Sequence, residues 1–369
     1  MDSGPTSSTL TAEQPIVISV DCMGGDRGPS AVVAGLFISA DAYPSAHFLL
    51  HGDDAVIRPL LAKRADLAGR ITVVHAARIV TMDDKPSQVM RHGEGTSMWS
   101  TIDAVKSGKA TVAVSCGNTG ALMAVSMIRL RKLPGVARPA IACFWPSRNP
   151  GGFNVMLDVG ADIKGDADDL MQYAMMGASY ARNALGLKRP RVGLLNVGTE
   201  EHKGSAELKL AQETLQANAV AGDYDYVGFV EGSDIPSDRV DVIVTDGFTG
   251  NIALKTAEGT ARLVSEFLRT TLSSTIWAKL GSLLARRAFR RLSEKMDSRR
   301  INGGVFLGLN GTVVKSHGGA DAKGVAAAIG LAICLAQAGF LQRLAARVAS
   351  AKAAGQDAAL EAQGAGNPQ

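Results

Sequence analysis

The chain alternates short runs of apolar, often β-branched residues with longer segments that have helical spacing. The apolar runs predict strands at 16–20, 48–51, 71–75, 111–115, 140–144, 154–158, 191–196, 226–230, 242–244, 303–309 and 311–317. The segments between them predict helices at 28–42, 55–64, 96–106, 121–131, 168–186, 205–217, from about 250 onward and at 320–347. This alternation favours an α/β fold built on a doubly wound, mostly parallel sheet.

The segment 240–255 combines a buried strand, a glycine turn and the start of a helix. Asp246 and Gly247 end the strand, Gly250 and Asn251 open the helix, and Lys255 follows on it. Free backbone N–H groups and the helix dipole favour an anion at such a junction. The design recurs at 17–29, 112–122, 155–160 and 192–204. We expect all five junctions to converge on one edge of the sheet and to form a crevice for phosphate.

The segment 273–300 departs from this alternation because it carries two amphipathic faces. The first face contains Ile276, Trp277, Leu280, Leu283 and Leu284. The second face, rotated from the first, contains Phe289, Leu292 and Met296, and between the two faces cluster Arg286, Arg287, Arg290 and Arg291. This pattern predicts two short helices that meet near 284–287 and project as a hairpin tipped with cations.

The composition places this chain among globular proteins. Of its 369 residues 46% are hydrophobic and 20% charged, and a net charge of +4 does not indicate a nucleic-acid partner. The four cysteines lack metal-ligand spacing, so we expect reduced thiols and no metal site. Neither a signal peptide nor an apolar run of membrane-spanning length is evident, so we expect a soluble cytoplasmic protein. We expect disorder at 1–14 and 349–369 and one catalytic α/β domain over 15–348, which includes the hairpin.

Two glycine-rich turns are candidates for anion binding. In the turn 21–26, the amides of Gly24 and Gly25 are suited to phosphate or phosphopantetheine, although a tight strand–helix connection explains the same residues. In the turn 115–120, Gly117 and Gly120 allow a ligand to approach closely. Neighbouring Asn118 offers neutral hydrogen bonds to an anion or to a developing oxyanion, as does the adjacent threonine.

The loop 196–204 places two carboxylates and a lysine just past a strand. A solvated loop with local ion pairs is one explanation of Glu200, Glu201 and Lys203. The alternative is a charged cradle in which Lys203 and Lys255 hold a small anion, while Asp246 orients their ammonium groups and balances their repulsion. Both explanations stay open on the sequence.

Other motifs narrow the chemistry further. His317 follows a strand and is either an acid or base or a structural histidine. Cys116 is a weak candidate for a nucleophile because no histidine motif lies near it. The chain lacks GxGxxG after its first strand, GxxxxGK[ST], HExxH and GxSxG, so dinucleotide binding is weakly supported and P-loop, metal and serine-hydrolase chemistry are not indicated.

Eight motifs, in order over about residues 16–345, resemble those of the bacterial phosphate acyltransferases, the acyl-ACP:phosphate transacylases of phospholipid synthesis. They are VDCMGGDRGP (20–29), HGDD (51–54), SCGNTGALM (115–123), RPA (138–140), LDVGAD (157–162), LLNVGTEEHKG (194–204), DGFTGNIALKTAEG (246–259) and GGVFLGLNGTVVKSHG (303–318). Cys22 and Cys116 stand where that family usually has alanine, which argues against Cys116 as a required nucleophile. Asp162 replaces a usual asparagine, and Thr199 a usual glutamate.

The resemblance implies that long-chain acyl-ACP and inorganic phosphate give acyl phosphate and free carrier, and that the product feeds a membrane-bound glycerol-3-phosphate acyltransferase. It also implies a Rossmann-like α/β/α fold similar to phosphotransacetylases and isopropylmalate dehydrogenases, a homodimer, and peripheral association with the membrane. No cofactor is expected, because phosphopantetheine arrives on the carrier protein. Phosphate attack on a thioester needs only a positioned dianion and oxyanion donors.

This chemistry assigns roles to the candidate residues. Lys203 and Lys255 are expected to hold phosphate together with the glycine-rich amides. Asn118 or Asn251 is expected to donate to the oxyanion, and His317 to protonate the departing thiolate. The residues predicted to bind substrate are Gly24, Gly25, Asp26, Gly117, Thr119, Gly120, Glu201, Gly247 and Gly250.

The hairpin bears on the choice between functions. Its apolar faces are suited to a membrane interface and its arginines to anionic headgroups, while a dimer contact and docking of the acidic carrier are alternatives. The rival functions are a short-chain phosphotransacetylase, a non-catalytic acyl or phosphate sensor at membranes, and a dehydrogenase. The hairpin favours a long-chain product delivered to a membrane over acetyl transfer.

Overall fold

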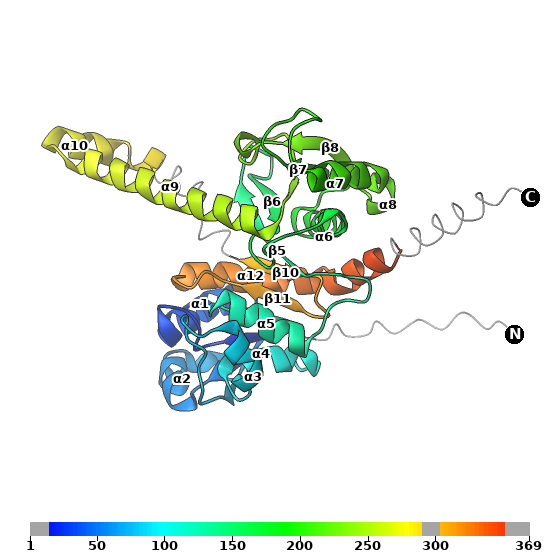
Figure 1. Ribbon diagram of the computed structural model, residues 1–369. Coiled ribbons are helices and arrows are strands. Elements are labelled where there is room, and N and C mark those ends of the chain that lie inside the picture. The colour runs from blue at the N-terminus through cyan, green and yellow to red at the C-terminus, as the bar shows by residue number, and fades with distance from the viewer. Residues whose placement is uncertain (1–14, 290–302, 351–369) are drawn as a thin grey trace, which may run out of the picture.

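The computed structural model describes residues 15–289 and 303–350, and one 11-stranded sheet runs through them (Figure 1). The strands are β1 Val17–Asp21, β2 His47–Gly52, β3 Ile71–His75, β4 Val112–Ser115, β5 Ala140–Pro146, β6 Phe153–Leu157, β7 Arg191–Leu195, β8 Asp225–Val230, β9 Val242–Val244, β10 Gly304–Leu307 and β11 Thr312–Lys315. Their order in the sheet is β3-β2-β1-β4-β11-β10-β5-β6-β9-β7-β8.

Most of the described helices begin where the sequence supplies a capping side chain. Asn118, Asp166, Asp246 and Asp321 each accept a backbone N–H in the first turn of the helix that follows. The helices are α1 Gly28–Ala42, α2 Asp54–Leu61, α3 Pro86–His92, α4 Ser97–Lys106, α5 Thr119–Arg129, α6 Ala167–Leu185, α7 Ala206–Ala217, α8 Ala219–Gly222, α9 Gly247–Ser273, α10 Ile276–Leu284 and α12 Ala322–Gln337. A further helix at Phe340–Ser350 follows α12, so the predicted closing segment forms two helices.

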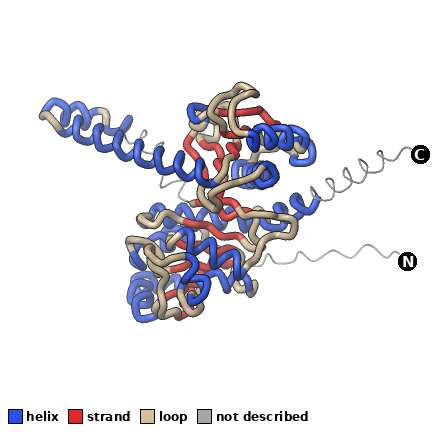
Figure 2. The backbone as a smooth tube through the Cα atoms, viewed as in Figure 1, coloured by secondary structure: helices blue, strands red, loops and turns tan. Residues whose placement is uncertain are grey.

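Side chains along the strands alternate between two apolar layers, one on each face of the sheet. On β4, Val112 and Val114 belong to the layer that includes α1, α6 and α12, while Ala113 belongs to the layer that includes α4 and α5. Leu254 of α9 packs against the second layer. Figure 2 shows the strands in red between these helices in blue. The predicted α/β/α sandwich around a mostly parallel sheet is confirmed; the expectation of one catalytic domain over 15–348 stays a prediction.

The strands do not keep one direction across the sheet. Strands β3, β2, β1, β4 and β11 are parallel, and so are β6, β9, β7 and β8, but three antiparallel pairings at β11–β10–β5–β6 separate the two groups. An odd number of reversals turns the second group around relative to the first. The expectation that all five glycine junctions share one edge is therefore wrong: β1 and β4 end at one edge, and β6, β7 and β9 at the other.

Helix α9 leaves the body of the protein, and α10 folds back along it, so that the two form a projecting arm (Figure 1). The described arm differs from the predicted hairpin, because it pairs α9 with α10 and turns at residues 274–275, while most of the second predicted helix lies outside the described residues. Helical structure breaks at Ala285 and restarts at Arg286, as predicted for 284–287. Arg290, Arg291, Leu292, Met296 and the tails 1–14 and 351–369 lie outside the described residues.

The helices of the described residues differ in length and apolar character from membrane-spanning helices. No single helix there is long and apolar enough to cross a membrane. One pair, Ala322–Gln337 with Phe340–Ser350, reaches the length and composition together but is bent by 59°.

Candidate active site

A row of buried polar residues crosses the first parallel group of strands near their carboxyl ends. The row runs from His51 on β2 through Asp21 on β1 and Ser115 on β4 to Lys315 on β11, each in register with the next. Register neighbours point to the same face of a sheet, and here it is the face covered by α4 and α5. Sequence reasoning gave no role to Asp21 or Lys315, because only pairing of distant strands places them side by side.

The Asp21 carboxylate joins the first two strand-end turns. Ser115 Oγ donates to Asp21 Oδ2 at 2.7 Å and accepts the Gly117 N–H at 3.0 Å. Burial raises the pKa of Asp21, and hydrogen bonds from Ser115 and Ser97 act against that rise. A Cβ on Gly24 would lie 2.7 Å from both Asp21 Oδ2 and the Gly117 nitrogen, so packing alone requires glycine there.

Lys315 is a lysine held inside the protein, with 8% of its surface exposed. Its Nζ donates to the Ser316 carbonyl and, at 3.5 Å, to the Cys116 carbonyl. Burial, together with the charge of Lys255, lowers the pKa of Lys315 to about 8, although Cys116, Asp26 and Asp21 act to raise it. The two lysines whose charges act on each other are therefore Lys255 and Lys315.

The turn after β11 closes against the turn after β1. The Asp26 N–H donates to the Gly318 carbonyl at 2.8 Å, and the Ser316 N–H donates to the Ser115 carbonyl at 2.9 Å. Gly25 has a φ of +94°, and a Cβ there would lie 2.9 Å from the Gly318 carbonyl. Three strand ends, after β1, β4 and β11, thus form one compact group of backbone amides and carbonyls.

Helix α9 carries Lys255 to this group. Lys255 Nζ lies 2.8 Å from Glu258 Oε2, and the same oxygen lies 3.9 Å from His317 Nε2. The Gly319 N–H donates to His317 Nδ1 at 3.1 Å, which holds the ring over its own turn. The structure thus brings the predicted residues Lys255 and His317 together through Glu258, to which sequence reasoning gave no role.

Asn118 already has partners for its side-chain amide. Its Oδ1 accepts the Ala121 N–H at 3.1 Å, and its Nδ2 donates to the carbonyls of Met82 at 2.9 Å and Asp84 at 3.0 Å. Both amide donors thus hold the 82–84 loop, and donation to an oxyanion would require one of these bonds to open. A Cβ on Gly120 would meet the Pro86 ring at 2.9 Å, so this glycine serves packing, while Thr119 is exposed beside it.

The first turn of α9 forms a second group at the opposite edge. Asp246 accepts the Thr249 N–H at 2.7 Å and the Thr249 hydroxyl at 3.1 Å, so these described bonds go to its own helix rather than to a lysine. A Cβ on Gly247 would lie 2.0 Å from the Asp162 carbonyl oxygen, and one on Gly250 would lie 1.9 Å from that of Asp158. Both glycines let α9 lie directly on the 158–162 loop, and exposed Asn251 faces Gly160 of that loop.

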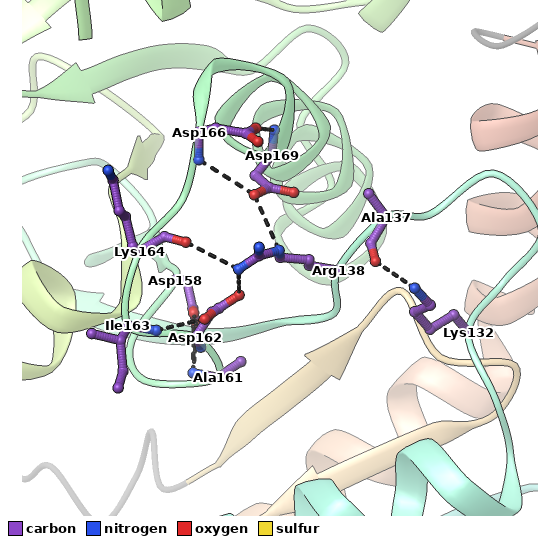
Figure 3. A network of polar contacts seen from close by, with 10 residues as sticks. All are labelled: Lys132, Ala137, Arg138, Asp158, Ala161, Asp162, Ile163, Lys164, Asp166 and Asp169. Atoms are coloured by element: carbon purple, nitrogen blue, oxygen red, sulfur yellow. Dashed lines mark hydrogen bonds and ion pairs between the residues drawn. The ribbon is translucent and has the colours of Figure 1, made fainter. Parts of the chain in front are cut away.

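The 158–162 loop is held by a polar network (Figure 3). Fully buried Asp158 accepts backbone N–H groups of the loop, including those of Ala161 at 3.0 Å and Asp162 at 2.9 Å. Arg138 pairs with Asp162, lies 3.4 Å from Asp169 and donates to the Lys164 carbonyl at 3.2 Å. An aspartate at position 162 therefore gives Arg138 a charged partner that an asparagine would not.

Lys203 lies on the loop after β7 and has a local partner. Its Nζ is 2.8 Å from Glu200 Oε1, and that contact raises the pKa of Lys203. The lysine side chain is 41% exposed, and Glu201 is exposed beside it. These contacts match the solvated loop with ion pairs, and the structure shows no contact that joins Lys203 to Lys255 among the residues it describes.

Two groups fall outside acid–base and nucleophilic chemistry. His51 is buried between Ser19 Oγ and Ser100 Oγ at 2.8 Å each, and burial lowers its pKa to about 4, so the ring is neutral. Burial also raises the pKa of the Cys116 thiol, which keeps it protonated near neutral pH. Across the described ranges, no cluster of His, Cys, Asp and Glu has the arrangement of metal ligands.

Sequence comparisons point to one family. The family described as fatty acid synthesis protein matches residues 16–343. A phosphate acyltransferase of Cereibacter sphaeroides is 71% identical over 353 residues, which cover 96% of each chain. Another of Paracoccus denitrificans is 68% identical over 342 residues, which cover 92% of each chain.

Solved structures share the fold at low sequence identity. A phosphotransacetylase from Streptococcus pyogenes has a TM-score of 0.57 and 17% identity, covering 87% of this chain and 93% of its own. The EutD phosphotransacetylase from Staphylococcus aureus has a TM-score of 0.55 and 14% identity, covering 87% and 94%. The predicted likeness of the fold to phosphotransacetylases is confirmed.

Proposed function

The chain belongs to the family of bacterial phosphate acyltransferases and is an acyltransferase, and we propose that it moves a long-chain acyl group from acyl carrier protein to inorganic phosphate. Acyl transfer with phosphate follows from the family. The carrier-bound, long-chain donor is the finer part of the proposal, and it is supported by the apolar arm, which a short-chain reaction does not need.

The reaction is complete with two substrates. An oxygen of HPO₄²⁻ attacks the thioester carbonyl carbon, the carbon–sulfur bond breaks, and the phosphate proton passes to the departing thiolate. The products are the acyl phosphate and the free carrier thiol. Because proximity and electrostatic stabilisation are enough for this step, the proposal includes no cofactor beyond the phosphopantetheine of the carrier.

The observation that carries the proposal is the group of strand ends after β1, β4 and β11, faced by Lys255. Helices α1, α5 and α12 all begin beside these turns, so their N-termini favour an anion at the same edge. His317, 52% exposed and 3.9 Å from Glu258, is the residue proposed to pass the proton to the thiolate. Asn251 and Asn118 stay proposed oxyanion donors, and Lys203 a proposed second phosphate contact.

The test is product analysis. The purified protein is incubated with palmitoyl-ACP and ¹⁸O-labelled inorganic phosphate, and acyl phosphate is detected by mass spectrometry. We expect labelled palmitoyl phosphate and free carrier in equal amounts, and much less product from acetyl-CoA. Preference for acetyl-CoA would favour a short-chain phosphotransacetylase, and ligand binding without turnover would favour a sensor.

The arm supports the proposed setting of the reaction. Its exposed apolar side chains include Phe267, Trp277 and Leu284 at 62%, 77% and 83% exposure. We propose that the protein is a cytoplasmic homodimer that attaches peripherally to anionic membrane through this arm and hands its product to a membrane-bound glycerol-3-phosphate acyltransferase. Amphipathic insertion suits a product whose chain is insoluble in water.

A further inference from the structure

Of the three ammonium protons of Lys315, one has no acceptor among the described residues. A lysine ammonium has three donors, and those of Lys315 with described partners go to the Ser316 and Cys116 carbonyls. The adjacent Ser316 hydroxyl is fully buried and, among the described residues, has no oxygen or nitrogen partner; the Cys116 thiol lies within hydrogen-bond reach. Lys315 and Ser316 are therefore two buried polar residues whose hydrogen-bonding capacity the described residues do not fully use.

The charged and titratable groups that act on Lys315 come from several parts of the fold. Asp21 lies on β1, Asp26 on the turn after it, Cys116 on the turn after β4, and Lys255 on α9. Lys255 opposes the charge of Lys315, as expected for two nearby ammonium groups, and Lys255 also pairs with Glu258 at 2.8 Å. A dianion between the two lysines would turn that repulsion into two attractions.

A buried cation is costly unless it is compensated, and such residues concentrate at functional sites. By contrast, Lys203 and Arg58 are exposed and paired within one helical turn of sequence, as ordinary surface charges are. The position of Lys315 at the end of β11, among three glycine turns and opposite Lys255, is unlike theirs.

We propose that Lys315 binds the phosphate dianion in this site, and that Lys255 faces it from α9. The inference rests on the proposed function for the identity of the anion, but its own claim concerns which lysine holds it. Lys315 then replaces Lys203 as the partner of Lys255 in the cradle.

The competing explanation is a structural one, in which Lys315 only joins the turns after β4 and β11 through their carbonyls. That role needs donors but no titrating charge at the site. The two explanations therefore differ in how phosphate binding responds to pH and to a permanently charged replacement.

The first experiment measures the KM for inorganic phosphate in Lys315→Met and in the wild type. We expect it to rise about 10- to 100-fold in the variant, the loss typical of one charged hydrogen bond, with the KM for the acyl donor changed less than about twofold. The matched control is Lys106→Met, an exposed lysine in the last turn of α4. A phosphate KM in Lys315→Met within about twofold of the wild type would overturn the inference.

The second experiment keeps the inference testable if Lys315→Met does not fold. We expect wild-type phosphate binding to weaken as pH rises through about 8, because Lys315 then loses its proton. Inorganic phosphate only becomes more negative over that range, so its own titration predicts the opposite. In Lys315→Arg the guanidinium stays charged, and we expect this alkaline loss to move upward in pH. An alkaline loss at the same pH in Lys315→Arg would contradict the inference.

Phosphate binding is also measured without any acyl donor, by equilibrium dialysis of ³²P-labelled inorganic phosphate. Dialysis separates the inference from the proposed function. Weaker binding in Lys315→Met supports the inference even if the wild type forms no acyl phosphate, in which case only the proposed function fails. Equal binding in both proteins, with acyl phosphate formed by both, overturns the inference and leaves the function standing.

Discussion

The two ends of α9 differ in what they contact. At the inner end Gly247 and Gly250 are buried against the 158–162 loop, and Leu254 packs on the core. At the outer end Leu263 is 48% and Phe267 62% exposed. The inner end of α9 therefore positions Lys255 at the strand ends. The outer end exposes apolar surface that the described residues do not cover. Apolar exposure of this kind marks an interaction site.

The largest effect is expected from a substitution that disrupts the contact between the inner end of α9 and the 158–162 loop. In Gly250→Ala the new Cβ would lie 1.9 Å from the Asp158 carbonyl oxygen, a backbone atom of a buried loop. We expect the free energy of unfolding, measured with urea, to fall by about 4 kcal/mol or more.

The matched control is Gly259→Ala on the same helix, where nothing lies within 4 Å of the new Cβ. We expect that change to stabilise the protein by up to about 1 kcal/mol, because alanine is the better helix former. If the two substitutions had equal effects, the inner end would not be a tight contact.

The second prediction concerns the buried charge of Lys315, which interacts with Lys255 on the inner end of α9. Because the pKa of Lys315 is about 8 in the folded protein and 10.5 for an ordinary lysine, the unfolded chain binds more protons between those values. Stability should therefore rise with pH over that window, by about 3 kcal/mol relative to Lys315→Met. Below pH 8 the cost of the buried charge is fully present. Urea unfolding of both proteins at pH 7 and above pH 10 measures the difference, and a constant difference would exclude a titrating buried lysine.

The third prediction compares the inner end with the loop after β7. Lys255→Met should raise the phosphate KM about 10-fold, because its charge acts at the strand ends beside Lys315. Lys203→Met should raise it less than about threefold, because Lys203 is 41% exposed and paired with Glu200. Initial rates at varied phosphate decide this. A larger effect of Lys203→Met would restore the original cradle and place the anion nearer β7.

The last prediction concerns α10, which folds back along the outer end of α9, and we expect the fold to stay almost unchanged. The double variant Leu280→Glu and Leu284→Glu should change the free energy of unfolding by less than about 0.5 kcal/mol, because both residues are exposed. It should abolish flotation with vesicles that contain anionic lipid. Phosphate KM with a soluble donor is the control and should not move. Unchanged flotation would remove the membrane proposal and favour a dimer contact.

Local structure was largely predictable because its causes are local. The start of α9 just after Asp246 and the amphipathic face around Trp277 are set by residues a few positions apart. The site was only partly predictable. The glycine turns and Lys255 were found by pattern, but the same pattern at Gly247 and Gly250 proved to serve helix packing. A glycine that approaches a ligand and one that approaches a backbone look identical in sequence.

What the sequence determined by itself is the set of elements, their order, the anion-favouring turns and the family to which the chain belongs. What only the tertiary structure decided is which strand ends meet. Three antiparallel pairings reverse the second group of strands, and the pairing of β4 with β1 and β11 aligns Asp21, Ser115 and Lys315 in one row. Strand pairing is a choice among distant segments, made by the burial of whole faces rather than by any short stretch of residues. For that reason a buried lysine at the end of β11 gained its significance only in the folded chain.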